Sequence, residues 1–91
     1  MDSIHLEVSG RVQGVGFRWF VADKARRLRL AGWVKNRPDG NVEIAAAGTA
    51  EALAKLESAV ASGPPGAQVQ NVSRLPHIAP VSLLSPFAIV R

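Results

Sequence analysis

The sequence contains no cysteine and no tyrosine, and aromatic residues make up only 5% of it. The absence of cysteine excludes disulfide frameworks, thiolate nucleophiles and cysteine-based zinc sites. The two histidines, His5 and His77, are far apart in the sequence and form no local pair of metal ligands. No apolar run approaches the ~18 residues of a membrane span, and no basic segment followed by an apolar run indicates a signal peptide. These absences predict a small soluble, cytoplasmic domain that binds no membrane.

The hydrophobic content of the chain is sufficient for one packed core. The chain has 91 residues, of which 47% are hydrophobic and 20% are charged. Two domains would leave neither half with enough apolar area to fold alone. We therefore predict a single domain over residues 1–91.

The charge is unevenly distributed along the chain. The net charge is +4, but residues 11–37 carry eight cations against one anion, while the remainder has a net charge of −3. A basic segment on a slightly acidic body favours an anionic ligand. On charge alone, a solvated basic helix face remains the alternative.

Hydrophobic periodicity predicts the element order β-α-β-β-α-β, followed by a short final strand. Thr49 is suited to cap the second helix, and the spacing of Val69 and Val72 indicates a bulge in the fourth strand or a misplaced edge of that strand. The strands are predicted at residues 4–8, 32–36, 41–47, 68–74 and 87–90, and the helices at residues 17–30 and about 50–62.

This order is typical of the α+β ferredoxin-like sandwich, an antiparallel sheet with two helices on one face. In that topology the first two strands run parallel with the third between them, so their C-terminal ends meet at one edge. The loop over residues 10–17 leaves the first strand there, and Asn36 ends the second strand there. We therefore expect the loop and Asn36 to converge.

That loop has the composition of an anion-binding segment, with glycine at positions 10, 14 and 16. Glycines let successive N–H groups point into one concavity, and the following helix N-terminus adds partial positive charge. Arg18 adds a planar guanidinium suited to phosphate oxygens. The spacing matches neither the nucleotide P-loop nor the dinucleotide fingerprint. The alternative is a plain strand-to-helix turn with Arg18 at the surface.

Residues 10–18 (GRVQGVGFR) and 32–36 (GWVKN), followed by residues 39–43 (DGNVE), resemble the two signature blocks of the acylphosphatase family. Residues 63–66 and 87–91 are also similar to that family, so the resemblance covers nearly the whole chain. It implies the ferredoxin-like fold and an enzyme that hydrolyses acyl phosphates to a carboxylate and inorganic phosphate. It implies no metal and no cofactor.

The resemblance also implies roles for named residues. The asparagine of the second block, Asn36, would position the attacking water. The arginine of the first block, Arg18, would bind the phosphate with its side chain. The backbone amides of the loop would bind it too, and these belong to Gln13, Gly14, Val15, Gly16, Phe17 and Arg18.

Such a site needs no acid–base pair, because an acyl phosphate expels a carboxylate that requires little protonation. The protein must hold the phosphoryl group, neutralise its oxygens and align a water in line with the breaking bond. The oxygen of Asn36 can accept from that water while its NH₂ group donates elsewhere.

Other polar residues are weaker candidates. Asp39 is interpreted as a turn residue, and Asn41 as structural. His5, Glu7 and Glu43 are expected on solvent-facing strand positions, and Lys35 is expected on the opposite strand face from Asn36.

Three features do not fit a simple pattern. Arg29 stands where the family usually has glycine, so a left-handed conformation there would cost about 1 kcal/mol. Trp19 lies off the apolar stripe of its helix. Residues 80–86 are apolar for a loop, which suggests packing over the sheet or a contact between chains.

Two other functions are compatible with this fold class. An RNA-binding module would use the basic helix, but such modules stack bases on sheet aromatics, and here only Trp33 and Phe87 are predicted on strands. A non-catalytic, anion-sensing domain is the second alternative, since acylphosphatase-like modules occur within larger proteins. We expect a free, monomeric enzyme that binds no nucleic acid.

Overall fold

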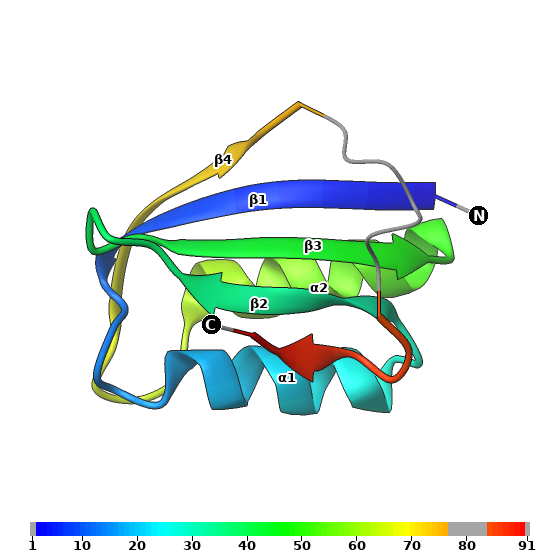
Figure 1. Cartoon of the computed structure of the whole chain (residues 1–91), viewed down its shortest axis with the longest axis horizontal. Helices are drawn as coiled ribbons and strands as arrows, with labels where there is room; N and C mark the ends of the chain where they lie inside the picture. The colour runs from blue at the N-terminus through cyan, green and yellow to red at the C-terminus, as the bar shows by residue number, and fades with distance from the viewer. Residues whose placement is uncertain (1, 77–83, 91) are drawn as a thin grey trace.

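A computed structural model describes residues 2–76 and 84–90 of the chain. The elements follow the predicted order, with the helices on one side of a five-stranded sheet (Figure 1). Their bounds are β1 (Asp2–Arg11), α1 (Phe17–Arg27), β2 (Ala31–Asn36), β3 (Val42–Gly48), α2 (Ala50–Ser62), β4 (Gln68–Arg74) and β5 (Ala88–Ile89). The ferredoxin-like prediction is confirmed.

The strand order is β4-β1-β3-β2-β5. Strand β3 pairs antiparallel with both β1 and β2, so β1 and β2 run parallel to one another as predicted. Strand β5 pairs parallel with β2, through Trp33 with Ala88 and Val34 with Ile89. The prediction of an antiparallel sheet was therefore wrong at this edge, and the sheet is mixed. Strand β5 has only two residues, which is too short for the sequence pattern to indicate whether it pairs parallel or antiparallel.

The core lies between the sheet and the helices. In β1, Ile4, Leu6 and Val8 are buried, because alternate strand residues face the helices. The buried stripe of α1 includes Phe17, Val21 and Ala25, and α2 contributes a stripe that includes Leu56. Full burial of a large apolar side chain stabilises the fold by roughly 1.5–3 kcal/mol, so these side chains fix the helices on the sheet.

The predicted bulge is present where β1 pairs with β4. Ser9 pairs with Asn71 and Gly10 pairs with Val69, which leaves Gln70 as the extra residue. Gly10 has a φ of 121°, and a side chain there would collide with the carbonyl of Gln68. Gly10 therefore allows close strand packing at the point where the chain enters the glycine-rich loop.

Helix α1 ends at Arg27, three residues earlier than predicted. The N–H of Leu30 donates to the carbonyl of Ala25 at 2.9 Å, and Arg29 between them has a φ of 59°. This arrangement is a Schellman-type ending whose left-handed residue is normally glycine. The structure confirms that Arg29 occupies a left-handed position.

The apolar segment over residues 80–86 lies mostly outside the described residues, as does most of the loop predicted over residues 77–86. Within the described ranges, no helix is long and apolar enough to cross a membrane.

Candidate active site

The site begins at the N-terminus of α1. Gly14 and Gly16 have φ values of 75° and 76°, in the left-handed region. Gly16 is the N-cap residue, so no side chain caps the helix, and the first turn contains no acidic residue. The first amides of a helix have no intrahelical acceptor. The loop therefore presents unsatisfied donors and partial positive charge.

Residues from separate parts of the chain line one cleft of about 160 Å³ at this end of the molecule. Figure 1 shows the β1–α1 loop and the end of β2 at the same end of the sheet. The cleft is lined by Val12, Gly14, Gly16, Phe17, Arg18, Trp19, Asn36 and Ile89. The predicted convergence of the glycine-rich loop, Arg18 and Asn36 is confirmed.

Asn36 reaches the cleft because it lies on the helix-facing side of β2. Along β2 it follows the buried Val34 by two residues, so both side chains point to the same face of the sheet. Asn36 Oδ1 is buried and accepts no hydrogen bond from the part of the chain that the structure describes. A buried acceptor without a donor costs about 1–3 kcal/mol, so this oxygen is suited to receive a donor from the cleft.

Arg18 is half-buried beside the cleft, and it forms no ion pair within residues 2–76 and 84–90. Two cations on the same helix as Arg18 are engaged instead. Arg27 pairs with Asp23 at 3.1 Å, and Arg26 donates to the carbonyl of Phe87 at 2.8 Å. The guanidinium at the cleft is thus available to an anion.

Gln13 has a structural role that the sequence did not reveal. Its Nε2 donates to the carbonyls of Arg37 and Asn41, each at 2.9 Å. The side chain thereby links the glycine-rich loop to the turn between β2 and β3. Neither Gln13 nor Val15 lines the cleft, so a contribution of their amides to phosphate binding stays a prediction.

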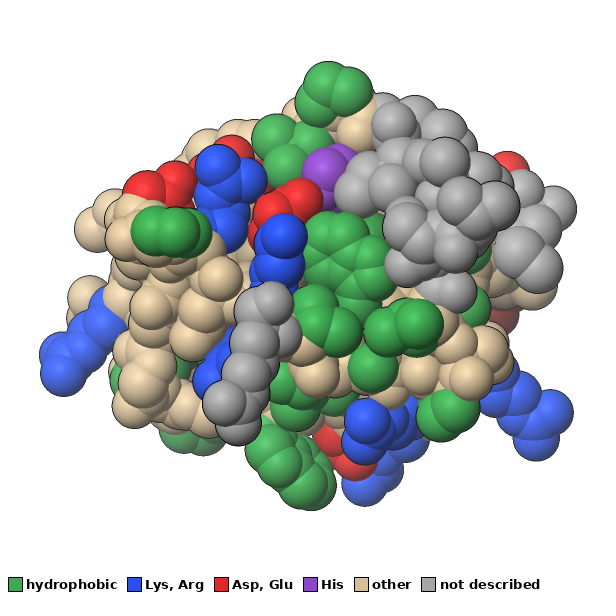
Figure 2. Space-filling model, viewed as in Figure 1, with side chains coloured by type: hydrophobic (Ala, Val, Ile, Leu, Met, Phe, Trp, Pro, Cys, Tyr) green, Lys and Arg blue, Asp and Glu red, His purple; other side chains and the backbone are tan. Residues whose placement is uncertain are grey.

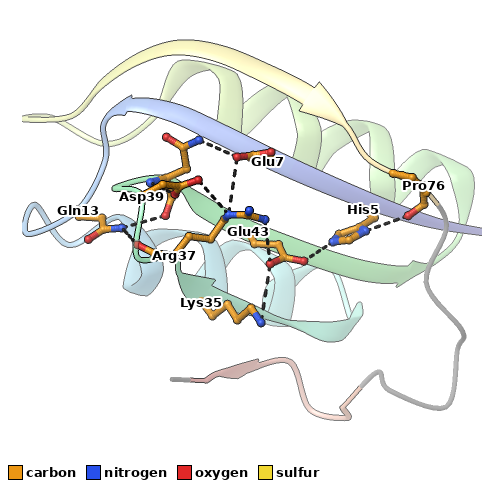
Figure 3. A network of polar contacts seen from close by, with 9 residues as sticks. His5, Glu7, Gln13, Lys35, Arg37, Asp39, Glu43 and Pro76 are labelled. Atoms are coloured by element: carbon orange, nitrogen blue, oxygen red, sulfur yellow. Dashed lines mark hydrogen bonds and ion pairs between the residues drawn. The ribbon is translucent and has the colours of Figure 1, made fainter.

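The opposite face of the sheet carries a charged network, drawn in Figure 3. His5 Nε2 lies 2.5 Å from a carboxylate oxygen of Glu43, and Glu43 also contacts Arg37 at 3.5 Å and Lys35 at 3.8 Å. The side chains of His5 and Glu43 are only 11% and 12% exposed. The expectation that they are surface residues was wrong, because their partners come from other strands and cover them.

The same network continues around the β2–β3 turn. Asn41 Nδ2 donates to Glu7 at 2.7 Å, and Arg37 lies 3.7 Å from Glu7, whose side chain is 24% exposed rather than fully solvated. Asp39 Oδ1 accepts from the backbone N–H of Asn41 at 3.0 Å. The structural interpretations of Asp39 and Asn41 are confirmed. In Figure 2 these charges lie beside a hydrophobic area at the centre of the open face.

The two aromatics expected on strands do not form a stacking platform. Phe87 is fully buried in the core, and it precedes β5 rather than belonging to it. Trp33 lies on β2, with its ring 6.1 Å from that of His5 and 5.3 Å from Lys35 Nζ. A single half-buried ring gives little support to the RNA-binding alternative.

Comparisons with known proteins show which family the chain belongs to. The acylphosphatase family model matches residues 4–88. An acylphosphatase from Acidiphilium cryptum is 54% identical over 72 residues, which cover 79% of this chain and 79% of that protein. The chain belongs to the acylphosphatase family. The crystal structure of the acylphosphatase from Bacillus subtilis agrees, with a TM-score of 0.86 and 43% identity over 98% of each chain.

The same fold also occurs as part of a longer protein. HypF from T. kodakarensis matches the whole of this chain with a TM-score of 0.85 and 32% identity, but the match covers 12% of HypF. The resemblance seen in residues 10–18 and 32–36 is thus confirmed at the level of family and fold. The roles of Arg18, Asn36 and the loop amides are not tested by these comparisons.

Proposed function

We propose that this member of the acylphosphatase family hydrolyses the carboxyl–phosphate bond by clamping the phosphoryl group and positioning a water. The observation that carries the proposal is the single cleft lined by the loop glycines, Arg18 and Asn36. The substrate class is acyl phosphates, and the products are a carboxylate and inorganic phosphate.

The phosphate end of the substrate is held by two kinds of positive group. The loop amides and the first turn of α1 donate hydrogen bonds, supported by the partial positive charge of the helix. Arg18 adds a formal charge and a planar pair of donors. Together these donors stabilise the negative charge of the transferring phosphoryl group.

Asn36 orients the nucleophile in this proposal. Its buried, unpartnered oxygen accepts a hydrogen bond from the water. The water oxygen forms the new bond to phosphorus while the bond from phosphorus to the acyl oxygen breaks. The carboxylate leaves with the electron pair of that bond, and the proton lost by the water passes to product phosphate or solvent. Alignment, rather than proton transfer to a side chain, supplies the catalysis.

Hydrolysis of benzoyl phosphate, followed by ultraviolet absorbance, tests the proposal. The wild type should turn the compound over, and Arg18→Gln should lose both turnover and inhibition by inorganic phosphate. Asn36→Ala should lower kcat by about 10²–10³ while keeping phosphate inhibition, since one positioned group is worth that much. An Asn36→Ala enzyme with full kcat would refute the positioning role.

Further expectations accompany this proposal. We propose one domain over residues 1–91, a monomer, a cytoplasmic location and no nucleic-acid partner. A single unfolding transition, light scattering, cell fractionation and filter binding to RNA check them in turn. We also expect turnover to be unchanged in EDTA, and a loss of activity in the chelator would mean that a metal takes part.

A further inference from the structure

An exposed tryptophan lies beside the phosphate loop. Trp19 is 69% exposed, more than any other large hydrophobic side chain that the structure describes. One exposed hydrophobic residue requires no explanation by itself. Its location does, because Trp19 lines the same cleft as Arg18 and Asn36.

A second apolar side chain lines this cleft from another element. Ile89 on β5 pairs with Val34 on β2 and is 36% exposed. Its position is fixed on both sides, because the N–H of Val90 donates to the carbonyl of Val34 at 2.9 Å and Arg26 on α1 donates to the carbonyl of Phe87. The short β5 strand therefore holds Ile89 at the cleft.

The cleft thus combines two chemistries. Arg18, the glycine amides and Asn36 suit the phosphoryl group, whereas Trp19 and Ile89 offer apolar surface that no catalytic step uses. An acyl phosphate likewise has a polar part and a less polar part, because its phosphoryl end is charged and its acyl end is a carbon group. When the phosphoryl group occupies the loop, the acyl group can lie along the apolar part of the cleft wall.

We propose that Trp19 and Ile89 form the binding site for the acyl group. The preferred substrates are then acyl phosphates with an aromatic or branched apolar acyl group, in preference to acetyl or carbamoyl phosphate. The indole face buries apolar area of the substrate and packs well against a ring. This inference rests on the proposed function, since it assigns the other half of the same substrate.

Paired substrates separate this site from the phosphate clamp. Benzoyl and acetyl phosphate carry the same phosphoryl group and differ in the acyl group. Trp19→Ala should lower kcat/KM for benzoyl phosphate by about tenfold, mainly through KM, because the lost contact acts on ground and transition states alike. Turnover of acetyl phosphate and inhibition by inorganic phosphate should stay close to wild type. Trp19→Phe should restore most of the loss.

Leu84 provides the matched control. It is 44% exposed and does not line the cleft, so Leu84→Ala should leave the preference for benzoyl over acetyl phosphate unchanged. An unchanged preference in Trp19→Ala, or an equal loss for both substrates, would overturn the acyl-group site. Failure of the proposed function is distinguishable, because the wild type would then hydrolyse neither substrate.

Binding can be observed without turnover. In a Trp33→Phe background, Trp19 is the one remaining tryptophan, because the sequence contains two. Benzoylmethylphosphonate, which cannot be hydrolysed at its carbon–phosphorus bond, should change the Trp19 emission at concentrations where methylphosphonate produces little change. Equal responses to the two phosphonates would place the acyl group elsewhere and refute the proposal.

Discussion

The two helices of this protein begin in opposite ways. Helix α2 has Thr49 as its N-cap, whose hydroxyl accepts from the N–H of Ala52 at 3.1 Å, and Glu51 in its first turn. At the matching positions of α1 stand Gly16, which has no side chain, and Arg18, which has the wrong charge for a helix start. The start of α2 thus has a side-chain cap, whereas the start of α1 has none, which leaves its donors free for the anion that we propose.

The difference extends to the opposite ends of the helices. The C-cap residue after α2 is Gly63, with a φ of 70°, whereas the residue with positive φ after α1 is Arg29. Helix α2 thus has the preferred cap residue at both ends, whereas α1 has it at neither, although the last turn of α1 carries the favourable cations Lys24, Arg26 and Arg27. The departure at the start of α1 coincides with the cleft, and the departure at its end has no contact with the cleft. Only the departure at the start of α1 is accounted for by the proposed function.

Exchange of the charges at the matching first-turn positions is the strongest test of this comparison. Arg18→Glu should reduce acyl phosphatase activity by roughly 10³-fold or more, because it replaces a charge clamp with a repelling group. The free energy of unfolding should stay the same or rise, since an acidic residue in the first turn contributes about 0.3–1 kcal/mol. Steady-state kinetics and chemical denaturation measure the two effects.

Glu51→Arg is the reciprocal variant and the control. It should leave kcat and KM unchanged and lower the free energy of unfolding by about 0.3–1 kcal/mol through the helix dipole. It also removes the exposed pair with Lys55, which is worth little. Full activity in Arg18→Glu would show that the open helix start is not the phosphate site.

Asn36→Ala should separate activity from stability in a different way. The variant removes a buried acceptor that has no donor within the described ranges. We therefore expect kcat to fall by about 10²–10³, while the melting temperature stays the same or rises because the unsatisfied oxygen is gone. A loss of several degrees together with the loss of kcat would mean that Asn36 supports the fold instead.

Removal of the cap of α2 should affect stability alone. Thr49→Ala should lower the free energy of unfolding by about 1 kcal/mol, since the N–H of Ala52 loses its acceptor. Thr49→Ser keeps the hydroxyl and should retain most of the stability. Activity toward benzoyl phosphate should be equal in both variants, because α2 does not line the cleft.

Arg29→Gly should produce the smallest of these effects, and in the stabilising direction. Glycine adopts the φ of 59° found there without strain, which is worth up to about 1 kcal/mol against its greater freedom in the unfolded chain. Arg29 forms no ion pair among the described residues, so the variant loses none. Thermal unfolding measures the change, and a lower melting temperature would contradict the assignment.

The order of elements was predictable because each signal is local. Alternation in β1, the 3.6-residue period of α1 and the Thr49 cap are all set by neighbours in the sequence. The convergence of Arg18 and Asn36 was predictable too, because the handedness and order of a split βαβ unit follow from that pattern.

What escaped prediction depends on partners distant in the sequence. His5 and Glu43 are 38 positions apart, and their side chains, which contact one another, are almost entirely buried. The position of Ile89 at the cleft depends on β5, whose parallel pairing with β2 involves only two residue pairs. Strand periodicity carries information about which face a residue occupies, but not about which side chains meet across that face.

The bridge formed by Gln13 couples two segments that strand pairing leaves independent. The carboxamide of Gln13 joins the glycine-rich loop to both sides of the β2–β3 turn. If ligand binding makes the loop more ordered, we expect the turn to become more ordered too, because Gln13 holds the carbonyls of Arg37 and Asn41. Phosphate should slow hydrogen exchange of the turn amides, and Gln13→Ala should abolish that remote protection.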